Sequence, residues 1–199
     1  MILTLPLAFA LALPHPRTPA LDTAVFAGGC FWGVEAVFEH TRGVREVVSG
    51  YAGGKGENPT YEEVTTGGTG HAESVRVIYD PSQVSYATLL RVFFSIAHDA
   101  TELNRQGPDI GTQYRSAIFY RSDAQKREAE AYIRQLTAAK YYPDPIVTEL
   151  SPLAAFYLAE EYHQDFMARN PRNPYIVFHD VPKIEKYRKL LPDLFIAKK

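Results

Sequence analysis

The chain has 199 residues, of which 46% are hydrophobic and 22% charged, and this composition supports one sizeable core. Its 21 Lys and Arg residues nearly balance its 23 Asp and Glu residues, which excludes the basic field that nucleic-acid binders need to displace phosphate counterions. The single cysteine excludes an internal disulfide and a multi-thiolate zinc site.

The first twenty residues form an apolar run that ends in a Pro-rich break. Ala8, Ala10 and Ala12 would suit a signal peptidase, but no Lys or Arg precedes the run. The run is also shorter than the about 20 residues that a membrane span needs. Residues 1–20 therefore read either as an export leader, which implies a periplasmic or secreted protein, or as a disordered extension of a cytoplasmic one. Residues 21–199 are expected to form a single domain.

From Thr23 onward, short strand-like runs alternate with helical ones, which predicts an α/β or α+β domain. Gly29 permits a sharp turn from the first strand into the first helix. In the first half of the chain, alternating or helical spacing of apolar residues predicts strands over 24–28, 45–51 and 73–79, and helices after Gly29 and over 85–99.

The second half of the chain begins with a loop rich in Gly, Asp and Asn over 99–111. Ser122 is a suitable N-cap for a long helix that follows the next strand. The expected elements are a strand over 114–120 and helices over 122–136, 151–166 and 184–191. The helix over 151–166 is expected to bury the stripe Ala155, Leu158, Ala159, Tyr162 and Phe166.

Cys30 lies where the first strand turns into the first helix. A lone cysteine is usually a small buried hydrophobe. A thiol in the first turn of a helix, however, lies near unpaired N–H groups that favour the thiolate, which makes Cys30 a candidate nucleophile. Phe31 and Trp32 follow it directly, where their rings would flank the sulfur. Such rings suit a small, soft group such as S-methyl, and plain core packing is the alternative.

Glu73 shares a strand face with apolar residues. In GHAESVRVIYD, alternation places Glu73 on the side of Val75, Val77 and Tyr79. The carboxyl group then lies either in water beyond the edge of the core or inside it with a raised pKa. In the second case it would be uncharged near neutral pH and could act as a general acid.

Other polar residues allow several interpretations. Tyr61 and Tyr114 are near loop ends and could donate hydrogen bonds to a polarised oxygen, whereas Asp109 beside Gly and Pro suits a turn. The histidines show no paired metal spacing. Glu160 and His163 form a single copy of a pattern that metal-binding bundles repeat, so we interpret them as a solvated or hydrogen-bonded helix face and expect no metal.

Several motifs follow one another along the chain. GGCFWGVEAVF around Cys30 precedes GYAGG, NPTYEEV, TGHAESVRVIYDP and QGPDIGTQYRSAIFY. Together they resemble the type A peptide methionine sulfoxide reductases, over about residues 24–166. The resemblance implies a two-layer α/β (α+β) sandwich with a mixed sheet and a ferredoxin-like core. It also implies reduction of the S epimer of methionine sulfoxide, free or in proteins, with no metal or organic cofactor.

The resemblance also implies a role for each matching residue. Cys30 matches the nucleophile of the family, and Glu73 matches its proton donor. The substrate-binding residues that it implies are Phe31 and Trp32 for the methyl group, Tyr61 and Tyr114 for the sulfoxide oxygen, and Asp109 for positioning.

The chain departs from many members of the family at its C-terminal end. Those members carry further cysteines there, whereas this chain reads NPYIVFHDVPKIEKY. The expected cycle therefore leaves a sulfenic acid on Cys30, which a thiol from another molecule must reduce. Thioredoxin, glutaredoxin with glutathione, or a periplasmic dithiol would serve.

Two other functions would use the same cysteine. A one-cysteine thiol peroxidase would attack a peroxide with Cys30, but it would leave Phe31 and Trp32 without a role. A non-catalytic redox sensor would change a partner surface on oxidation, without turnover. The mixed charge favours a monomer with no obligatory partner.

Overall fold

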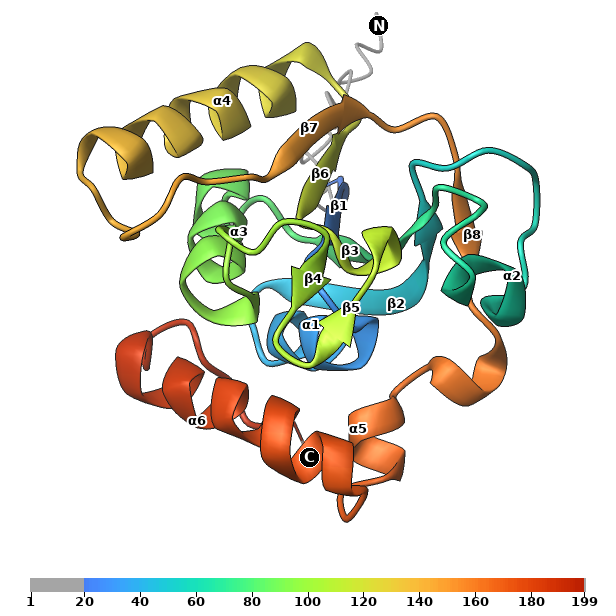
Figure 1. Ribbon diagram of the computed structural model, residues 1–199. Coiled ribbons are helices and arrows are strands. Elements are labelled where there is room, and N and C mark those ends of the chain that lie inside the picture. The colour runs from blue at the N-terminus through green and yellow to red at the C-terminus, as the bar shows by residue number, and fades with distance from the viewer. Residues whose placement is uncertain (1–19, 199) are drawn as a thin grey trace, which may run out of the picture.

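Figure 1 shows the computed structural model of the chain, of which residues 20–198 are described. The export-leader interpretation falls on residues 1–20, nearly all of which lie outside the described residues. No helix in the described part has the length and hydropathy needed to cross a membrane.

A curled six-stranded sheet forms the centre of the fold, with the strand order β7-β6-β1-β3-β2-β8. The strands are β1 (Asp22–Ala27), β2 (Val44–Ala52), β3 (Ala72–Tyr79), β6 (Ala117–Tyr120), β7 (Glu149–Pro152) and β8 (Phe156–Leu158). Strand β7 is parallel to β6, and the other neighbouring strands are antiparallel. The mixed sheet with helices confirms the predicted α+β class, while the ferredoxin-like label stays a prediction.

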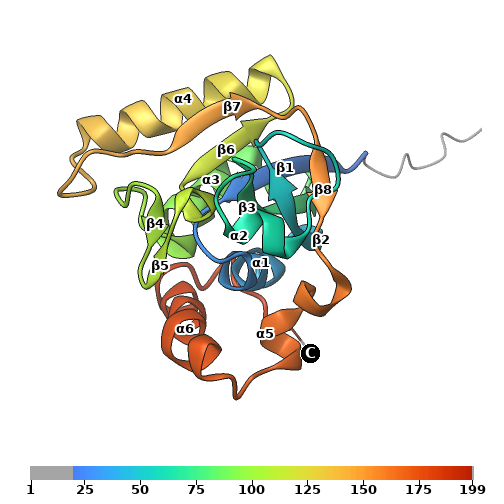
Figure 2. The same ribbon diagram turned by 45° about the vertical axis from the view of Figure 1, so that its right-hand side comes forward.

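The helices pack mainly against one face of this sheet. Helix α1 lies between the sheet and the C-terminal helices α5 and α6 (Figure 2). The helices are α1 (Phe31–Glu39), α2 (Tyr61–Thr65), α3 (Tyr86–Val92), α4 (Asp123–Ala138), α5 (Phe166–Arg169) and α6 (Val181–Leu190). Short π-helical turns continue α3 (Phe93–Ala97) and precede α6 (Ile176–Asp180).

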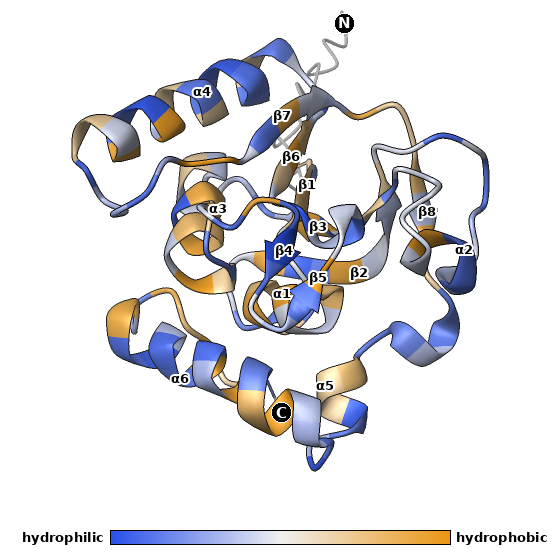
Figure 3. Ribbon diagram, viewed as in Figure 1, coloured by the Kyte–Doolittle hydropathy of each residue, from blue (hydrophilic) through white to orange (hydrophobic). Residues whose placement is uncertain are grey.

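The hydrophobic core has a large part and a small part. The large cluster joins one face of the sheet to α1, α3, α4 and α6, and includes Phe26, Phe38 and Phe93. The small cluster, around Val25 and Phe119, lies on the other face. Figure 3 shows hydrophobic residues concentrated on the central strands and α3, whereas α4 and α6 carry both kinds. This distribution is that of amphipathic helices covering a buried sheet.

The structure confirms most of the predicted elements within a few residues. Ser122 caps α4 as expected, because its side chain accepts a hydrogen bond from the Gln125 backbone N–H. The predicted loop over 99–111 contains a small hairpin of β4 (Arg105–Gln106) and β5 (Asp109–Ile110). The strand predicted from residue 114 begins later, because residues 112–114 form a 3-10 turn.

The predicted helix over 151–166 is wrong. Ser151 belongs to β7, which pairs with β6, and Phe156–Leu158 form β8, which pairs with Gly50–Ala52 of β2. This segment thus supplies both edge strands of the sheet, where unpaired backbone groups would otherwise remain. Hydrogen bonding to distant strands outweighed the helical spacing of its apolar residues. Only a 3-10 turn (Glu161–His163) and the short α5 follow it.

Candidate active site

Cys30 is the N-cap residue of α1, directly after β1, as the sequence predicts. The turn needs Gly29, whose φ of +89° is strained for other residues. A Cβ atom on Gly29 would lie 2.6 Å from the Gln106 side chain, and one on Gly28 would lie 2.9 Å from His98. The two glycines therefore let the segment around 98–106 pack tightly beside Cys30.

Glu73 is buried at the N-terminus of α1. Its Oε2 atom accepts a hydrogen bond of 3.0 Å from the Phe31 backbone N–H, and the residue is only 2% exposed. Burial raises the pKa of Glu73 to about 8, with a further increase from the charge of Asp109, although the Phe31 N–H lowers it. The buried alternative is therefore confirmed, and the water-exposed alternative is wrong.

The Cys30 thiol is also shielded from water, with an exposed fraction of 7%. Burial raises the pKa of Cys30, and the charges of Glu73 and Asp180 raise it further. The Trp32 N–H and the Lys183 ammonium group act in the opposite direction but are weaker. The Trp32 N–H at the helix N-terminus thus favours the thiolate, as expected, but desolvation outweighs this effect, so the pKa of Cys30 is raised overall.

Tyr61 and Tyr114 come from distant parts of the chain, but the side chains of both lie near Glu73 and Cys30. Tyr61 begins α2, and Tyr114 ends the 3-10 turn before β6. Burial, the charge of Glu73 and that of Cys30 raise the pKa of Tyr61 to about 12, and the same groups raise that of Tyr114. Both phenols therefore stay protonated at neutral pH and can donate hydrogen bonds.

Asp109 lies in β5 and does more than form a turn. Its Oδ2 atom accepts a hydrogen bond from the Tyr175 hydroxyl group, which comes from the segment before α6. Burial, the charge of Cys30 and the bond to Asp109 all raise the pKa of Tyr175. The hairpin and the C-terminal segment are thus linked across the site.

Aromatic rings surround the two residues that follow Cys30. Trp32 stacks on Phe166, with ring centroids 3.7 Å apart, and donates an Nε1–H hydrogen bond of 3.1 Å to His163 Nδ1. The Phe31 ring lies 4.9 Å from that of His163 and 5.9 Å from that of Tyr51. The rings of Phe31 and Trp32 thus belong to a larger aromatic cluster than the sequence indicates, and that cluster includes His163 and Phe166.

Three residues near these rings, Tyr51, Glu160 and His163, were missed or misinterpreted from the sequence. Glu160 accepts hydrogen bonds of 2.8 Å from the Tyr51 hydroxyl group and from the Tyr61 backbone N–H. His163 is only 1% exposed. Both residues are hydrogen-bonded, as one of the two alternatives held, but they belong to a 3-10 turn and its N-cap, not to a long helix face, and His163 is not solvated. Strand alternation could have found Tyr51, which pairs with Glu73 across β2 and β3, but no local signal connects Glu160 or His163 with the site.

The arrangement combines a nucleophilic sulfur, an uncharged acid, two phenols and an aromatic wall. Such a site can attack a soft electrophile and protonate the oxygen that the reaction sets free. Within residues 20–198, no group of three or more His, Cys, Asp or Glu side chains could hold a metal ion.

Comparison with known proteins identifies the family. The family model described as peptide methionine sulfoxide reductase matches residues 22–193. Peptide methionine sulfoxide reductase MsrA 2 from Mesorhizobium japonicum is 56% identical over 186 residues, which cover 94% of this chain and 95% of the relative.

Solved structures agree with this match. Reduced Mxr1 from Saccharomyces cerevisiae has a TM-score of 0.71 at 34% identity, covering 77% of this chain and 87% of that one. Mxr1 in complex with Trx2 has a TM-score of 0.52 at 25% identity, and the match covers 72% of this chain and 84% of that one. The chain therefore belongs to the peptide methionine sulfoxide reductase family, and within it to the MsrA enzymes, which are oxidoreductases.

Proposed function

We propose that Cys30 reduces the S epimer of methionine sulfoxide, free or in proteins, and that Glu73 protonates the sulfoxide oxygen. The observation that carries this proposal is the buried carboxyl group of Glu73, which binds the first backbone N–H of α1 next to Cys30. Its pKa of about 8 keeps it protonated at neutral pH. An acid without charge can give a proton to a leaving oxygen and does not repel an attacking thiolate.

In the proposed first step, the Cys30 sulfur attacks the sulfoxide sulfur while Glu73 gives its proton to the oxygen. The thiol proton of Cys30 returns Glu73 to its acid form. The hydroxyl group passes to the Cys30 sulfur as the old sulfur–oxygen bond breaks, the new bond between the two sulfurs also breaks, and methionine leaves. Cys30 is thereby oxidised by two electrons to a sulfenic acid, and the sulfoxide is reduced by two.

The remaining residues would hold the substrate. Phe31 and Trp32 would seat the methyl group, because aromatic rings attract soft sulfur-bound groups. Tyr61 and Tyr114 would donate hydrogen bonds to the sulfoxide oxygen, and Asp109, held by Tyr175, would help position the substrate.

A thiol from another molecule would complete the cycle, because Cys30 is the only cysteine of the chain. A thioredoxin is one candidate, since the related Mxr1 has been solved in complex with Trx2. Glutaredoxin with glutathione is another. No metal or organic cofactor takes part in the proposed cycle, and we propose that the protein acts as a monomer with residues 21–199 as its single domain.

A turnover assay tests this function. Purified protein is incubated with each epimer of methionine sulfoxide and excess dithiothreitol, beside the Cys30→Ser variant. We expect many turnovers on the S epimer and none for the serine variant. Equal rates on both epimers would contradict the proposed stereochemistry, and a stoichiometric reaction without turnover would favour the redox sensor. After one turnover without reductant, mass spectrometry should show one added oxygen on Cys30.

A further inference from the structure

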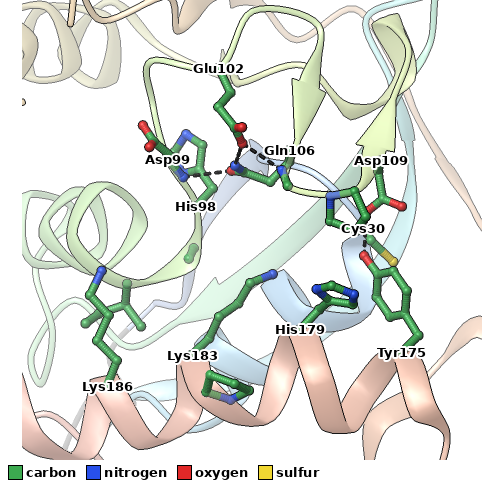
Figure 4. Close-up of a pocket in the computed structure, with 15 residues that line it drawn as sticks. Cys30, His98, Asp99, Glu102, Gln106, Asp109, Tyr175, His179, Lys183 and Lys186 are labelled. Carbon is green, nitrogen blue, oxygen red and sulfur yellow. Dashed lines mark hydrogen bonds between the residues drawn. The ribbon is translucent and has the colours of Figure 1, made fainter. Parts of the chain in front are cut away.

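Cys30 borders a cavity that the side chains of Phe31 and Trp32 do not line. The cavity, of about 380 Å³, opens onto Cys30 between the C-terminal segment and the loop over 96–109 (Figure 4). Asp109 and Tyr175 border it, but Phe31, Trp32 and Glu73 do not. The volume falls in the range of about 300–1,000 Å³ that small-molecule sites occupy. We call this space the recycling cleft.

The two walls of the recycling cleft carry opposite charges. One wall, formed by α6 and the turn before it, presents the ammonium groups of Lys183 and Lys186 beside the His179 ring. The other wall presents Asp99 and Glu102, as Figure 4 shows. The charged groups thus face one another across an open space, and a ligand with charges of both signs would match them.

The two lysines of this cleft differ in whether another side chain already binds them. The Lys183 Nζ atom lies 3.1 Å from Oδ1 of the buried Asp180, which holds the ammonium group at the cleft. Lys186 is exposed and forms no ion pair within residues 20–198. Lys186 is therefore available to bind an anionic group of a ligand.

The acidic wall is held in place by its own hydrogen bonds. Glu102 Oε2 accepts from the Gly107 backbone N–H at 2.7 Å and from the Gln106 amide group, and Glu102 Oε1 forms an ion pair with Arg105 Nε at 3.4 Å. Gln106 in turn accepts from the Asp99 backbone N–H at 2.7 Å and packs directly on Gly29. This wall is thus anchored one residue away from Cys30.

We propose that the recycling cleft binds the thiol that reduces the Cys30 sulfenic acid, and that this thiol is a small molecule carrying carboxylates and an ammonium group, as glutathione does. The inference rests on the function proposed above. Lys183 and Lys186 would bind the carboxylates of the thiol, and Asp99 would bind its ammonium group, next to Glu102, which already pairs with Arg105.

The direction from which a thiolate must attack the Cys30 sulfenic acid also favours the recycling cleft. The sulfenic oxygen comes from a sulfoxide held against the rings and Glu73, so it leaves toward that side. Displacement at sulfur is in line, so the attacking thiolate must approach from the opposite side. The recycling cleft reaches Cys30, and Phe31, Trp32 and Glu73 are not among the residues that line it.

The chemistry of this step balances with thiols alone. The thiolate of the small molecule attacks the Cys30 sulfur, and the hydroxide leaves as water with the proton of the incoming thiol. A mixed disulfide between Cys30 and the small thiol remains. A second thiol then attacks the mixed disulfide, which returns the Cys30 thiol and releases the oxidised small molecule as a disulfide.

The test compares a charged thiol with a neutral one. The Cys30 sulfenic acid is generated with one equivalent of methionine sulfoxide and mixed with glutathione or with 2-mercaptoethanol. The second-order rate constant for its loss is followed by mass spectrometry of quenched samples. The variants are Lys186→Met and Lys186→Glu. Lys189→Met is the matched control, since Lys189 is exposed on the same helix but does not line the cleft.

We expect Lys186→Met to lower the ratio of the glutathione rate to the 2-mercaptoethanol rate about twofold to fivefold, the size typical of one exposed ion pair. Lys186→Glu should lower it by about tenfold or more, and added salt should reduce the ratio of the wild-type protein. The Lys189→Met control should have the same rate ratio as the wild-type protein. The rate of sulfenic acid formation should be the same in all these proteins.

If the ratio of the two rates is unchanged in both Lys186 variants, the inference is wrong. It is also wrong if the variants lower the rates with glutathione and with 2-mercaptoethanol by the same factor. The absence of any sulfenic acid in the wild-type protein would instead contradict the proposed function. These two failures are distinguishable, because the first step is measured before any thiol is added.

Discussion

Burial, more than position on a helix, sets the proton chemistry of Cys30 and Glu73. Both side chains are buried at the edge of the core, and this burial raises the pKa of each. Both therefore hold their protons before substrate binds. A negative charge on Glu73 would further disfavour the Cys30 thiolate, so loss of the Glu73 proton removes the acid and weakens the nucleophile together.

The pH dependence of the first step follows from Glu73. The acid form is present below its pKa of about 8, so the single-turnover rate of methionine formation should fall as the pH rises through this value. Glu73→Gln keeps an acceptor for the Phe31 N–H but has no proton to give. It should be slower by about 100-fold or more at pH 7, in the range of a lost general acid.

The measurement is a series of single-turnover rates from pH 6 to pH 10 for both proteins. The wild-type rate should decline on the alkaline side, and the Glu73→Gln rate should lack this decline. An alkaline decline of the same midpoint in the glutamine variant would show that another group supplies the proton.

At the scale of elements, the junction of α1 with α6 places the C-terminal wall beside the sulfur. Gly33 faces Asp180, the residue before α6, and a Cβ atom there would lie 2.0 Å from Asp180 Oδ1 and 2.8 Å from Lys183 Nζ. Tyr187 of α6 donates a hydrogen bond of 2.9 Å to Thr41 beyond the other end of α1. Two contacts along α1 thus fix α6, and with it the basic wall.

Gly33→Ala should separate the two helices. Because Asp180 is fully buried and cannot move into solvent, the added methyl group should lower the free energy of unfolding by about 1–3 kcal/mol, as overpacking does. Urea denaturation checks this value. Gly68→Ala is the control, since Gly68 is exposed and its nearest neighbour would lie 3.3 Å away. Equal stability of the Gly33→Ala and wild-type proteins would contradict the tight junction.

At the scale of the whole molecule, buried carboxyl groups make stability depend on pH. Glu35 on α1 is 2% exposed and accepts a hydrogen bond from the Asp165 backbone N–H. Burial, together with the charges of Glu39 and Asp165, raises its pKa to about 8. The folded protein therefore binds a proton at Glu35 that the unfolded chain has lost above about pH 4.5.

Stability should consequently decrease as the pH rises from about 4.5 through 8, by a few kcal/mol at most for one group. Glu35→Gln is uncharged at every pH, so its free energy of unfolding should fall less between pH 6 and pH 9. Glu46→Gln, an exposed carboxylate on β2, is the control. Parallel curves for wild-type and Glu35→Gln proteins would show that Glu35 is already ionised in the folded state.

Local patterns in the sequence were sufficient for much of the fold and for the centre of the site. The alternation over 73–79 placed Glu73 on the core face, and the glycine pair before Cys30 placed the sulfur at the start of a helix. These features depend on residues within a few positions of one another, where the periods of strands and helices apply. The motif order alone also indicated the family.

The tertiary structure decided those features that depend on residues far apart in the sequence. It turned residues 149–158 into two edge strands and brought Tyr51 and His163 beside the Phe31 ring, with Glu160 bound to Tyr51. It also joined Asp109 to Tyr175. It also reversed the expected proton affinity of Cys30. Strand pairing and desolvation depend on which parts of the chain exclude water from one another, and no pattern within a single segment contains that information.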